Sequence, residues 1–482
     1  MLFDYDNKNE KSILEYASKL EGLTFREIIY AYKSYCVING IDYDKEKLSV
    51  LETNAKGQLG GLIEKYYFGY EPNSDQQADF SDVGIELKQT PLDLTSKNKY
   101  RAGERLSITN ISYNEPVIEN FYDSHVWEKI NKILLVQYLR DKSKDRLDYE
   151  IKKVSLYEPT AEDLKIIIDD YNKINEYIKA GKAHELSEGM TTYLGACTKG
   201  STADDSWRPQ YYGDKIPAKK RNYCLKQSYM NYLVNERLFK ETESIITNSE
   251  LLKNQTFEEL IVERINHYIG KTDLELCEKF SVDYKKDKQL WATLAYRMLG
   301  IKSNKASEFV KANIIVKAIR IEENNKIKEH MSFPHIKFKE LLEGEWEDSW
   351  PYNYFEQTRF LFVIYKKIDG RYTLLGSQMW NMPTDILNTK IKECWEYVRN
   401  VLKEGVVLTK TKDGIKNNFP GKDFNGITHL RPHASKSAYL LEDGTIIGNI
   451  ETDADELPDG RMMTKQCFWL NNTYIYDQLK YK

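Results

Sequence analysis

Residues 83–88, Val-Gly-Ile-Glu-Leu-Lys, constrain the fold more than any other part of this sequence. Their apolar side chains alternate with glycine, Glu86 and Lys88, and a period of two predicts a β-strand with one buried face. Glu86 and Lys88 then project from the same face, opposite the apolar side chains. Asp79 lies upstream of a turn-like pair, Ser81-Asp82, and a hairpin there would return Asp79 to the neighbourhood of Glu86.

Carboxylates beside an ammonium group are the side chains that Mg2+-dependent phosphodiester hydrolysis requires. Carboxylate oxygens bind a hard cation that keeps most of its waters. The cation lowers the pKa of a bound water, and Lys88 would orient or deprotonate that water and offset negative charge. A third carboxylate, Glu64, lies beside the apolar stripe of a helix expected at 57–69.

The alternative interpretation of this stretch is a solvated edge strand with ordinary surface charges. Because 30% of the residues are charged, an Asp-x6-Glu-x-Lys spacing often arises by chance, and alone it is weak evidence for a metal site.

Length and composition bound the remaining possibilities. The 482 residues suffice for two or three domains, and 41% hydrophobic residues indicate packed globular domains. A formal net charge of -4 means that a nucleic-acid partner would be met by a local basic patch. The six cysteines form no C-x2-C pair, which argues against zinc and disulfide frameworks. Without a secretory signal or an apolar run of 18 residues, we expect a cytoplasmic protein with no membrane partner.

The sequence up to residue 300 predicts further helices and strands, together with a basic segment. Strands are expected at 105–113, 133–139 and 149–157, and helices at 9–20, 24–37, 124–132, 160–179, 257–268 and 289–300. Residues 217–230 predict a basic strand or hairpin with interleaved aromatic side chains, and the alternative is a solvated charged edge strand. The basic side chains that we expect to meet phosphates there are Lys219, Lys220, Arg221 and Lys226.

The second half repeats the first, faintly but in a constant order. The aligned segments are 289–300 with 58–69, 313–319 with 84–90, 359–367 with 132–142, 385–406 with 160–183, 426–436 with 189–199, and 467–475 with 223–230. We therefore predict two domains, at 1–245 and 246–482.

The two copies differ at the acidic positions. Ile315 stands opposite Glu86 and Ala295 stands opposite Glu64, and neither side chain can hold a metal ion. The lysine is retained as Lys317. We therefore predict a second domain that binds DNA as an effector but cannot hydrolyse it. The alternative is a duplicate that only stabilises the first domain.

At this point the ordered set of Glu64, Asp79-x6-Glu86-x-Lys88 and Ser124-His125-Val126…Lys129 resembles the MutH family of endonucleases. Residues 183–200 and the two-domain length resemble more closely the type II restriction endonucleases of the Sau type, which cut at GATC. The resemblance covers nearly the whole chain and is strongest over 57–91, 179–230, 345–349 and 463–469.

The resemblance implies an α/β fold: two restriction-endonuclease-like (MutH-like) domains in tandem, each a mixed central sheet flanked by helices. It implies Mg2+ as cofactor, with Glu64, Asp79 and Glu86 as metal-binding carboxylates. Lys88 would be the catalytic lysine and Lys129 a second lysine near the scissile phosphate. The partner would be double-stranded DNA containing GATC, cut to 5′-phosphate ends. The second domain would bind a second GATC site, and the protein would be a monomer in solution that pairs on DNA.

In the MutH family a loop with Arg-Pro-Lys reads base edges, and the second half has Arg431-Pro432-His433 in that place. When Leu430 is aligned with Leu194, the counterpart in the first half is Gly195-Ala196-Cys197, which contains no basic residue. The residue that contacts guanine in the first half is therefore left open, and Lys199 is a candidate. The full set of expected DNA contacts is Thr198, Lys199, Lys219, Lys220, Arg221, Lys226, Arg431, His433 and Lys465.

Two other functions compete with a restriction endonuclease. The first is a strand-nicking endonuclease of mismatch repair, against which the duplicated second domain argues. The second is a non-catalytic, sequence-specific DNA-binding protein, against which the intact acidic set argues. The sequence contains no P-loop, no G-x-S-x-G and no H-E-x-x-H motif, so other enzyme classes have less support.

Overall fold

The chain forms two compact units in a computed structural model, which describes residues 4–42, 59–70, 77–95, 99–198, 207–214, 216–238, 245–246, 249–284, 289–301, 303, 306–412 and 414–481. Unit 1 comprises Met1–Thr256 and Ala306–Asn313, and unit 2 comprises Phe257–Lys305 and Ile314–Lys482. This division differs from the boundary expected at 245, because a short segment of the second half belongs to unit 1.

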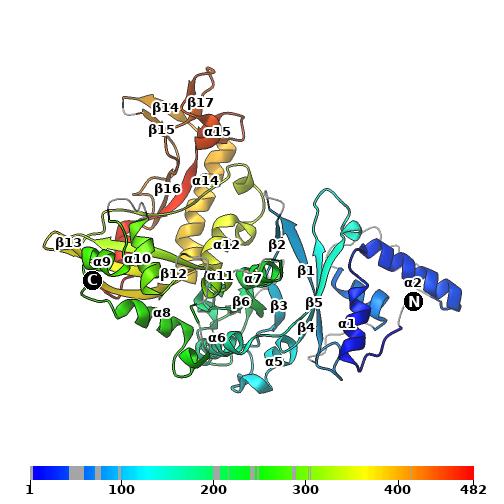
Figure 1. The fold of residues 1–482 in the computed structure, drawn as a ribbon. Helices are drawn as coiled ribbons and strands as arrows, with labels where there is room; N and C mark the ends of the chain where they lie inside the picture. The colour runs from blue at the N-terminus through cyan, green and yellow to red at the C-terminus, as the bar shows by residue number, and fades with distance from the viewer. Residues whose placement is uncertain are drawn as a thin grey trace. The chain divides into compact units, whose positions relative to one another are not determined.

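Unit 1 contains a mixed four-stranded sheet in the order β2-β1-β4-β5 (Figure 1). β1 pairs in parallel with β4, and the β1–β2 and β4–β5 pairs are antiparallel. The strand with the alternating pattern is therefore β1, an interior strand and not an edge. These strands are β1 (Glu86–Leu94), β2 (Tyr100–Ala102), β4 (Ile133–Leu139) and β5 (Ile151–Tyr157).

A second sheet of unit 1 is antiparallel, with the strand latest in sequence at its centre. Its order is β3-β9-β6, formed by β3 (Leu106–Asn110), β9 (Arg221–Leu225) and β6 (Leu194–Thr198). The basic segment is partly β9, but helix α7 begins at Gln227, so the predicted strand ends earlier than expected. A small pair, β7 (Trp207–Arg208) and β8 (Ala218–Lys219), precedes β9.

Two long helices of unit 1 begin at polar caps that the sequence supplies. Thr24 and Glu27 form a capping box at α2, and the Thr160 side chain caps α6. Apolar side chains from the first helices pack with those of β1, β4 and β5, and this core fixes the helix that carries Glu64 beside β1. The helices are α1 (Glu10–Ser18), α2 (Phe25–Asn39), α4 (Leu59–Ile63), η1 (Glu64–Phe68), η2 (Phe121–Asp123), α5 (His125–Ile130), η3 (Arg146–Asp148), α6 (Ala161–Lys179), η4 (Ala183–Glu185), η5 (Glu188–Met190), α7 (Gln227–Leu238), η6 (Ser249–Leu252) and α11 (Ser307–Ala312).

Unit 2 repeats the topology of both sheets. In the sheet β10-β12-β13 the first pair is parallel and the second antiparallel, as in β1-β4-β5. In the sheet β11-β21-β16 the strand latest in sequence is again central. These strands are β10 (Ile314–Ile321), β11 (Met331–His335), β12 (Arg359–Ile368), β13 (Arg371–Trp380), β16 (Thr428–Pro432) and β21 (Gln466–Leu470). The mixed α/β fold predicted from the sequence is confirmed.

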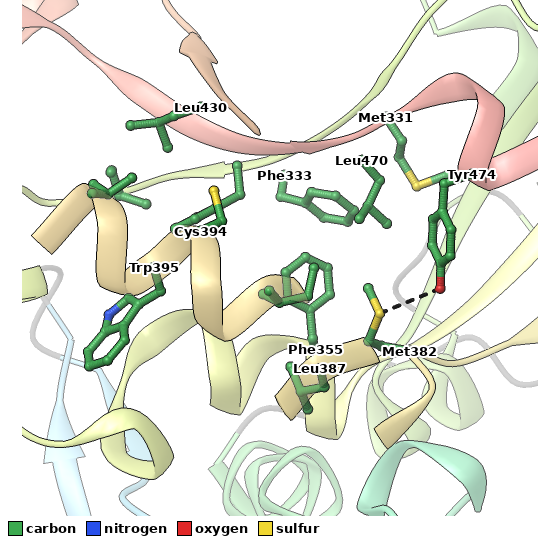
Figure 2. Close-up of a cluster of buried hydrophobic side chains, with 14 of the residues drawn as sticks. Met331, Phe333, Phe355, Met382, Leu387, Cys394, Trp395, Leu430, Leu470 and Tyr474 are labelled. Atoms are coloured by element: carbon green, nitrogen blue, oxygen red, sulfur yellow. Dashed lines mark hydrogen bonds between the residues drawn. The ribbon is translucent and has the colours of Figure 1, made fainter. Parts of the chain in front are cut away.

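The core of unit 2 is rich in aromatic side chains and methionines. Figure 2 shows part of it, in which the Tyr474 hydroxyl lies 4.0 Å from the Met382 sulfur. The surrounding elements are α8 (Phe257–Asn266), α9 (Asp273–Phe280), α10 (Leu290–Met298), η7 (Glu340–Leu342), η8 (Trp346–Asp348), α12 (Trp350–Gln357), α13 (Thr384–Ile386), η9 (Leu387–Ile391), α14 (Lys392–Glu404), β14 (Leu408–Thr411), β15 (Gly414–Asn417), β17 (Tyr439–Leu440), β18 (Ile446–Ile447), α15 (Ile450–Asp453), β19 (Ala454–Glu456), β20 (Met462–Thr464) and α16 (Asn472–Asp477). Within the described ranges, no helix is long and apolar enough to cross a membrane.

Strand register relates positions of the two copies. Glu86 pairs with Ile133, and Ile315 pairs with Phe360, so Ile315 takes the place of Glu86 when β4 and β12 are aligned as the sequence suggests. The preceding helices end alike, because Gly69 and Gly300 both have a φ of 80°. The repeat proposed from the sequence therefore has the same register in the first sheet.

In the second sheet the register corrects the sequence alignment. Leu194 pairs with the last residue of β9, whereas Thr428 pairs with the last residue of β21. Thr428, not Leu430, thus occupies the place of Leu194, and Arg431 takes the place of Cys197. The physical reason is that two short strands align almost equally well when slid by a residue or two, whereas ladder hydrogen bonds admit one register.

Residues 306–313 belong to unit 1 although the chain on either side of them belongs to unit 2. A buried ion pair holds this segment in unit 1. The Lys311 ammonium lies 2.8 and 3.0 Å from the two carboxylate oxygens of Asp163, and both side chains are buried. Tyr229 donates a third hydrogen bond to Asp163, and the ring of Tyr232 lies 4.3 Å from the ammonium.

We predict that Lys311→Ala lowers the unfolding free energy of unit 1 by about 3–5 kcal/mol, because it leaves the Asp163 charge buried without a cation. Urea denaturation followed by tyrosine fluorescence measures the change. Lys410→Ala, which removes an exposed ion pair with Asp443, is the control and should cost less than about 1 kcal/mol. Equal effects of the two substitutions would contradict the assignment of residues 306–313 to unit 1.

Candidate active site

Strand β1 carries two of the proposed active-site residues on one face. The Lys88 ammonium lies 2.6 Å from Oε1 of Glu86, which confirms that the two side chains project together. Glu86 is only 1% exposed, and β1 is flanked by strands on both sides. The interpretation as a solvated edge strand is therefore wrong. A buried carboxylate needs partners that offset its loss of hydration.

The expected turn before β1 brings Asp79 to the strand. Phe80 and Ile85 form an antiparallel bridge, and the intervening turn contains Gly84 in a left-handed conformation, with φ of 67°. Oδ2 of Asp79 accepts a hydrogen bond of 2.8 Å from the backbone N–H of Leu87. Asp79 thereby lies beside the residue that follows Glu86, as the sequence predicts.

Helix α5 supplies the second lysine. The Ser124 side chain caps this helix by accepting a hydrogen bond from the backbone N–H of Trp127. From the last turn, the Lys129 ammonium reaches both carboxylate oxygens of Glu86, at 3.1 and 3.2 Å, and the carbonyl of Gln77 at 3.4 Å. Glu86 therefore holds two ammonium groups at once.

Glu64 begins the π-helical turn η1, a rare conformation that occurs frequently at functional sites. Burial raises the pKa of Glu64 to about 7, and the charge of Asp79 adds to this effect while Lys88 opposes it. The pKa of Asp79 is also raised, first by burial and then by Glu86, while the hydrogen bond from Leu87 opposes the shift.

The donor chemistry fits a hard divalent cation. Burial first, and neighbouring carboxylates second, raise the pKa values of Glu64 and Asp79, and a bound cation would favour the charged forms of both groups. Mg2+ is commonly held by one or two carboxylates together with water and substrate phosphate, and Asp79 and Glu86 supply such a pair. In the described part of the chain, no three His, Cys, Asp or Glu side chains gather closely enough to hold one ion. The expected set with Glu64 as a third ligand is therefore not assembled in this structure.

Two of the predicted DNA contacts are buried. The Arg221 guanidinium donates to the carbonyl of Ala196, and the Lys226 ammonium donates to the carbonyl of Thr191 at 2.6 Å. Lys226 is only 1% exposed. Arg221 and Lys226 therefore stabilise the fold around β6. Because both side chains are buried, they do not face a DNA phosphate, contrary to the expectation from the sequence.

The other predicted contacts in unit 1 are accessible or lie outside the described residues. Thr198, Lys219 and Lys220 are partly exposed, and the Lys219 ammonium lies 6.0 Å from the centre of the Trp207 ring. Lys199 lies outside the residues that the structure describes.

In unit 2 the predicted contacts lie close together. Arg431 and His433 are exposed at the end of β16, and the guanidinium of Arg431 lies 5.3 Å from the centre of the Trp469 ring. The backbone N–H of His433 donates to the carbonyl of Lys465, which is partly exposed. The three basic residues thus occupy one surface.

Sequence reasoning missed the residues that hold β6 in place. Asp170 accepts backbone hydrogen bonds from Thr192, Tyr193 and Leu194, at the start of β6. Its position in the apolar stripe of α6, with isoleucines four residues on either side, is a sequence signal for a buried carboxylate. Arg105 was missed as well, because nothing in the sequence indicates its hydrogen bond to the carbonyl of Thr198.

The corresponding positions of unit 2 have lost the acidic pocket. Ala295, at the position of Glu64, is fully buried. Ile315 stands in place of Glu86, so Lys317 has no carboxylate there and donates to the carbonyl of Ser332 at 2.9 Å. Burial lowers the pKa of Lys317 to about 8. The alignment of β4 with β12 also puts Glu356, which is buried, at the position of Lys129.

Comparisons with known proteins agree with this geometry. A family model described as "DNA mismatch repair enzyme MutH" matches residues 68–170. The type II restriction enzyme Sau3AI of Staphylococcus aureus is 36% identical over an alignment 473 residues long, which covers 90% of this chain and 95% of that protein. DNA mismatch repair proteins MutH are similar to part of the chain. The protein of Pasteurella multocida is 24% identical over 48% of this chain and 97% of its own length, and that of Histophilus somni is 24% identical over 41% and 80%.

The match to Sau3AI extends over both units, whereas the MutH matches extend over less than half of the chain. The buried Glu86 with Asp79 and two lysines lies within or beside the segment that the MutH model matches. The chain therefore belongs to the family of type II restriction endonucleases that includes Sau3AI, site-specific deoxyribonucleases with a MutH-like nuclease domain.

Proposed function

We propose that this enzyme cuts double-stranded DNA at GATC with Mg2+ as cofactor and leaves 5′-phosphate ends. The observation that supports the chemistry best is the buried Glu86, which lies beside Asp79 and binds two lysine ammonium groups. The GATC sequence follows from the resemblance to the Sau type and from the extent of the similarity to Sau3AI.

Each side chain has a distinct role in this proposal. Asp79 and Glu86 provide oxygens for the cation, which when bound would lower the pKa of a water and offset charge on the phosphate. Lys88 orients the attacking water, and Lys129 faces the scissile phosphate. Both ammonium groups now neutralise Glu86, so they are preorganised at the place where phosphate charge must be stabilised.

The DNA contacts of unit 1 follow from exposure and charge. The partly exposed Lys219 and Lys220 would bind phosphates, and Thr198, the last residue of β6, would approach the major groove. Lys199, which lies outside the described residues, stays a candidate from the sequence alone. Asp170, Arg105 and the buried Arg221 hold β6 from within the protein, which supports a fixed position for Thr198 at its end.

Unit 2 would bind a second GATC site as an allosteric effector. Arg431 and His433 are exposed at the end of β16, and Arg431 is the counterpart of Cys197 when the two repeats are aligned by strand register. A single catalytic site cuts one strand, so two chains must pair on a palindromic sequence. Binding of a second DNA site by unit 2 would bring two monomers together on the DNA and so raise the local concentration of active sites.

Lys88→Ala should reduce the cleavage rate by at least roughly a hundredfold, because the side chain that orients the water is lost. Single-turnover cleavage of a GATC duplex with Mg2+ measures the rate, and gel shift with Ca2+ should show unchanged specific binding. Lys152→Ala, on strand β5 at the edge of the same sheet, is the control and should cleave normally. A Lys88→Ala enzyme that cuts at the wild-type rate would refute the catalytic assignment.

Glu64 predicts how stability depends on pH in the absence of divalent ions. Its pKa in the folded protein, about 7, lies above the ordinary glutamate value of 4.5, so the folded state binds a proton that the unfolded state has lost. The stabilising effect is complete below about pH 4.5 and disappears as the pH rises through 7. Glu64→Gln should therefore melt at a higher temperature than wild type at pH 8 and not at pH 4.5, as measured by thermal unfolding in EDTA. A difference that is equal at both pH values would contradict the burial of this carboxylate among like charges.

Arg431→Ala should separate effector binding from catalysis. Cleavage of a plasmid with two GATC sites should lose its advantage over a one-site plasmid, while the one-site rate stays within about twofold, because the catalytic unit is unchanged. The exposed Lys410 of the same unit provides a control, Lys410→Ala. A fall in one-site cleavage equal to the fall in two-site cleavage would refute the effector role. Accumulation of open circles by the wild-type enzyme would favour the nickase alternative.

A further inference from the structure

Tyr70 has a buried hydroxyl that accepts and donates no hydrogen bond within the described part of the chain. The neighbouring tyrosines all have partners: Tyr67 donates to the carbonyl of Tyr16 at 2.8 Å, Tyr16 donates to that of Tyr67 at 3.0 Å, and Tyr5 donates to that of Phe68 at 3.0 Å. A buried polar atom without a partner costs folding free energy and calls for an explanation. Tyr70 is the exception in an otherwise satisfied cluster.

Tyr70 lies close to two elements of the acidic site, because it follows the turn that begins at Glu64 and its ring packs against Phe80. The π-helical turn η1 ends at Phe68, and Gly69 follows it in a left-handed conformation. The Tyr70 ring then packs edge-on against Phe80, with ring centres 5.6 Å apart, and Phe80 directly follows Asp79. Burial and then the charges of Asp79 and Glu64 raise the pKa of Tyr70, so the hydroxyl remains protonated and is available as a donor.

Unit 2 provides an internal comparison. The residue after Gly300, which corresponds to Gly69, is Ile301, and it is buried. The copy that has lost the glutamates thus also lacks the hydroxyl at this position, although its helix ends in the same conformation. Packing alone does not require a hydroxyl at this position, because Ile301 is buried at the equivalent position of unit 2.

We infer that Tyr70 is a positioning residue of the nuclease reaction, and this inference rests on the proposed function. When DNA and the cation are bound, its hydroxyl donates a hydrogen bond into the acidic site and fixes the carboxylate of Asp79 for the reaction. Oδ2 of Asp79 is already held by the N–H of Leu87, so one further donor restricts the remaining freedom of this carboxylate. The unpaired hydroxyl of the free protein is the stability cost of that arrangement.

The test is Tyr70→Phe, which removes the hydroxyl and keeps the ring. Single-turnover cleavage of a GATC duplex with Mg2+ should slow roughly tenfold to a hundredfold, the effect of one hydrogen bond to a charged group. Duplex affinity, measured with Ca2+, should not change. The thermal midpoint of the metal-free protein should stay equal to that of wild type or rise, because no hydrogen bond is lost.

Tyr67→Phe is the matched control in the same turn. It removes a hydroxyl that has a partner, so its thermal midpoint should fall while its cleavage rate at 25 °C stays near that of wild type. A Tyr70→Phe protein that cleaves at the wild-type rate, or that loses thermal stability together with activity, would overturn the inference. If wild type itself does not cut GATC duplexes, the proposed function fails, and the melting comparison still reports whether the Tyr70 hydroxyl is unpaired.

Discussion

The structure of unit 1 depends on a buried negative charge. Glu86 lies on an interior strand, where a carboxylate without partners would be strongly destabilising. Two ammonium groups compensate it, one from the same strand and one from α5, so the strand, the helix and the turn that carries Asp79 have to meet correctly. Because removal of either partner leaves buried charge, this ion cluster also selects one arrangement of these elements. The cluster of Glu86, Lys88 and Lys129 is therefore formed in the protein without DNA.

Comparison of the two units shows what remains when this charge is lost. Unit 2 keeps the parallel pair, the antiparallel third strand and the lysine, but Lys317 bonds to a backbone carbonyl instead of a carboxylate. Its core contains aromatic and sulfur-containing side chains around α14 (Figure 2). The same topology thus supports a cluster of carboxylates and ammonium groups in one copy and a lysine bonded to a backbone carbonyl in the other, which illustrates that the chemistry of a site belongs to its side chains and not to the fold.

The sequence predicted the elements that depend on local patterns. The period of two gave β1, the turn residues returned Asp79 to it, and Thr160 marked the start of α6. Features decided by long-range packing were not predictable. The burial of Lys226 depends on the carbonyl of Thr191, and the true register of β16 depends on ladder hydrogen bonds to β21. Basic side chains in a sequence look alike whether they face solvent or a buried carbonyl.

The return of residues 306–313 into unit 1 limits how such a protein can be taken apart. A chain that ends near Thr256 would lack Lys311, and Asp163 would keep its buried charge with no counterion. Ile245 and Ile246 would also lose Glu308, the acceptor of their backbone hydrogen bonds. The halves are therefore not modules that gene fusion or truncation can exchange at a single point. Any shuffling event that transplants the nuclease must carry along a few residues encoded well downstream, in the middle of its partner.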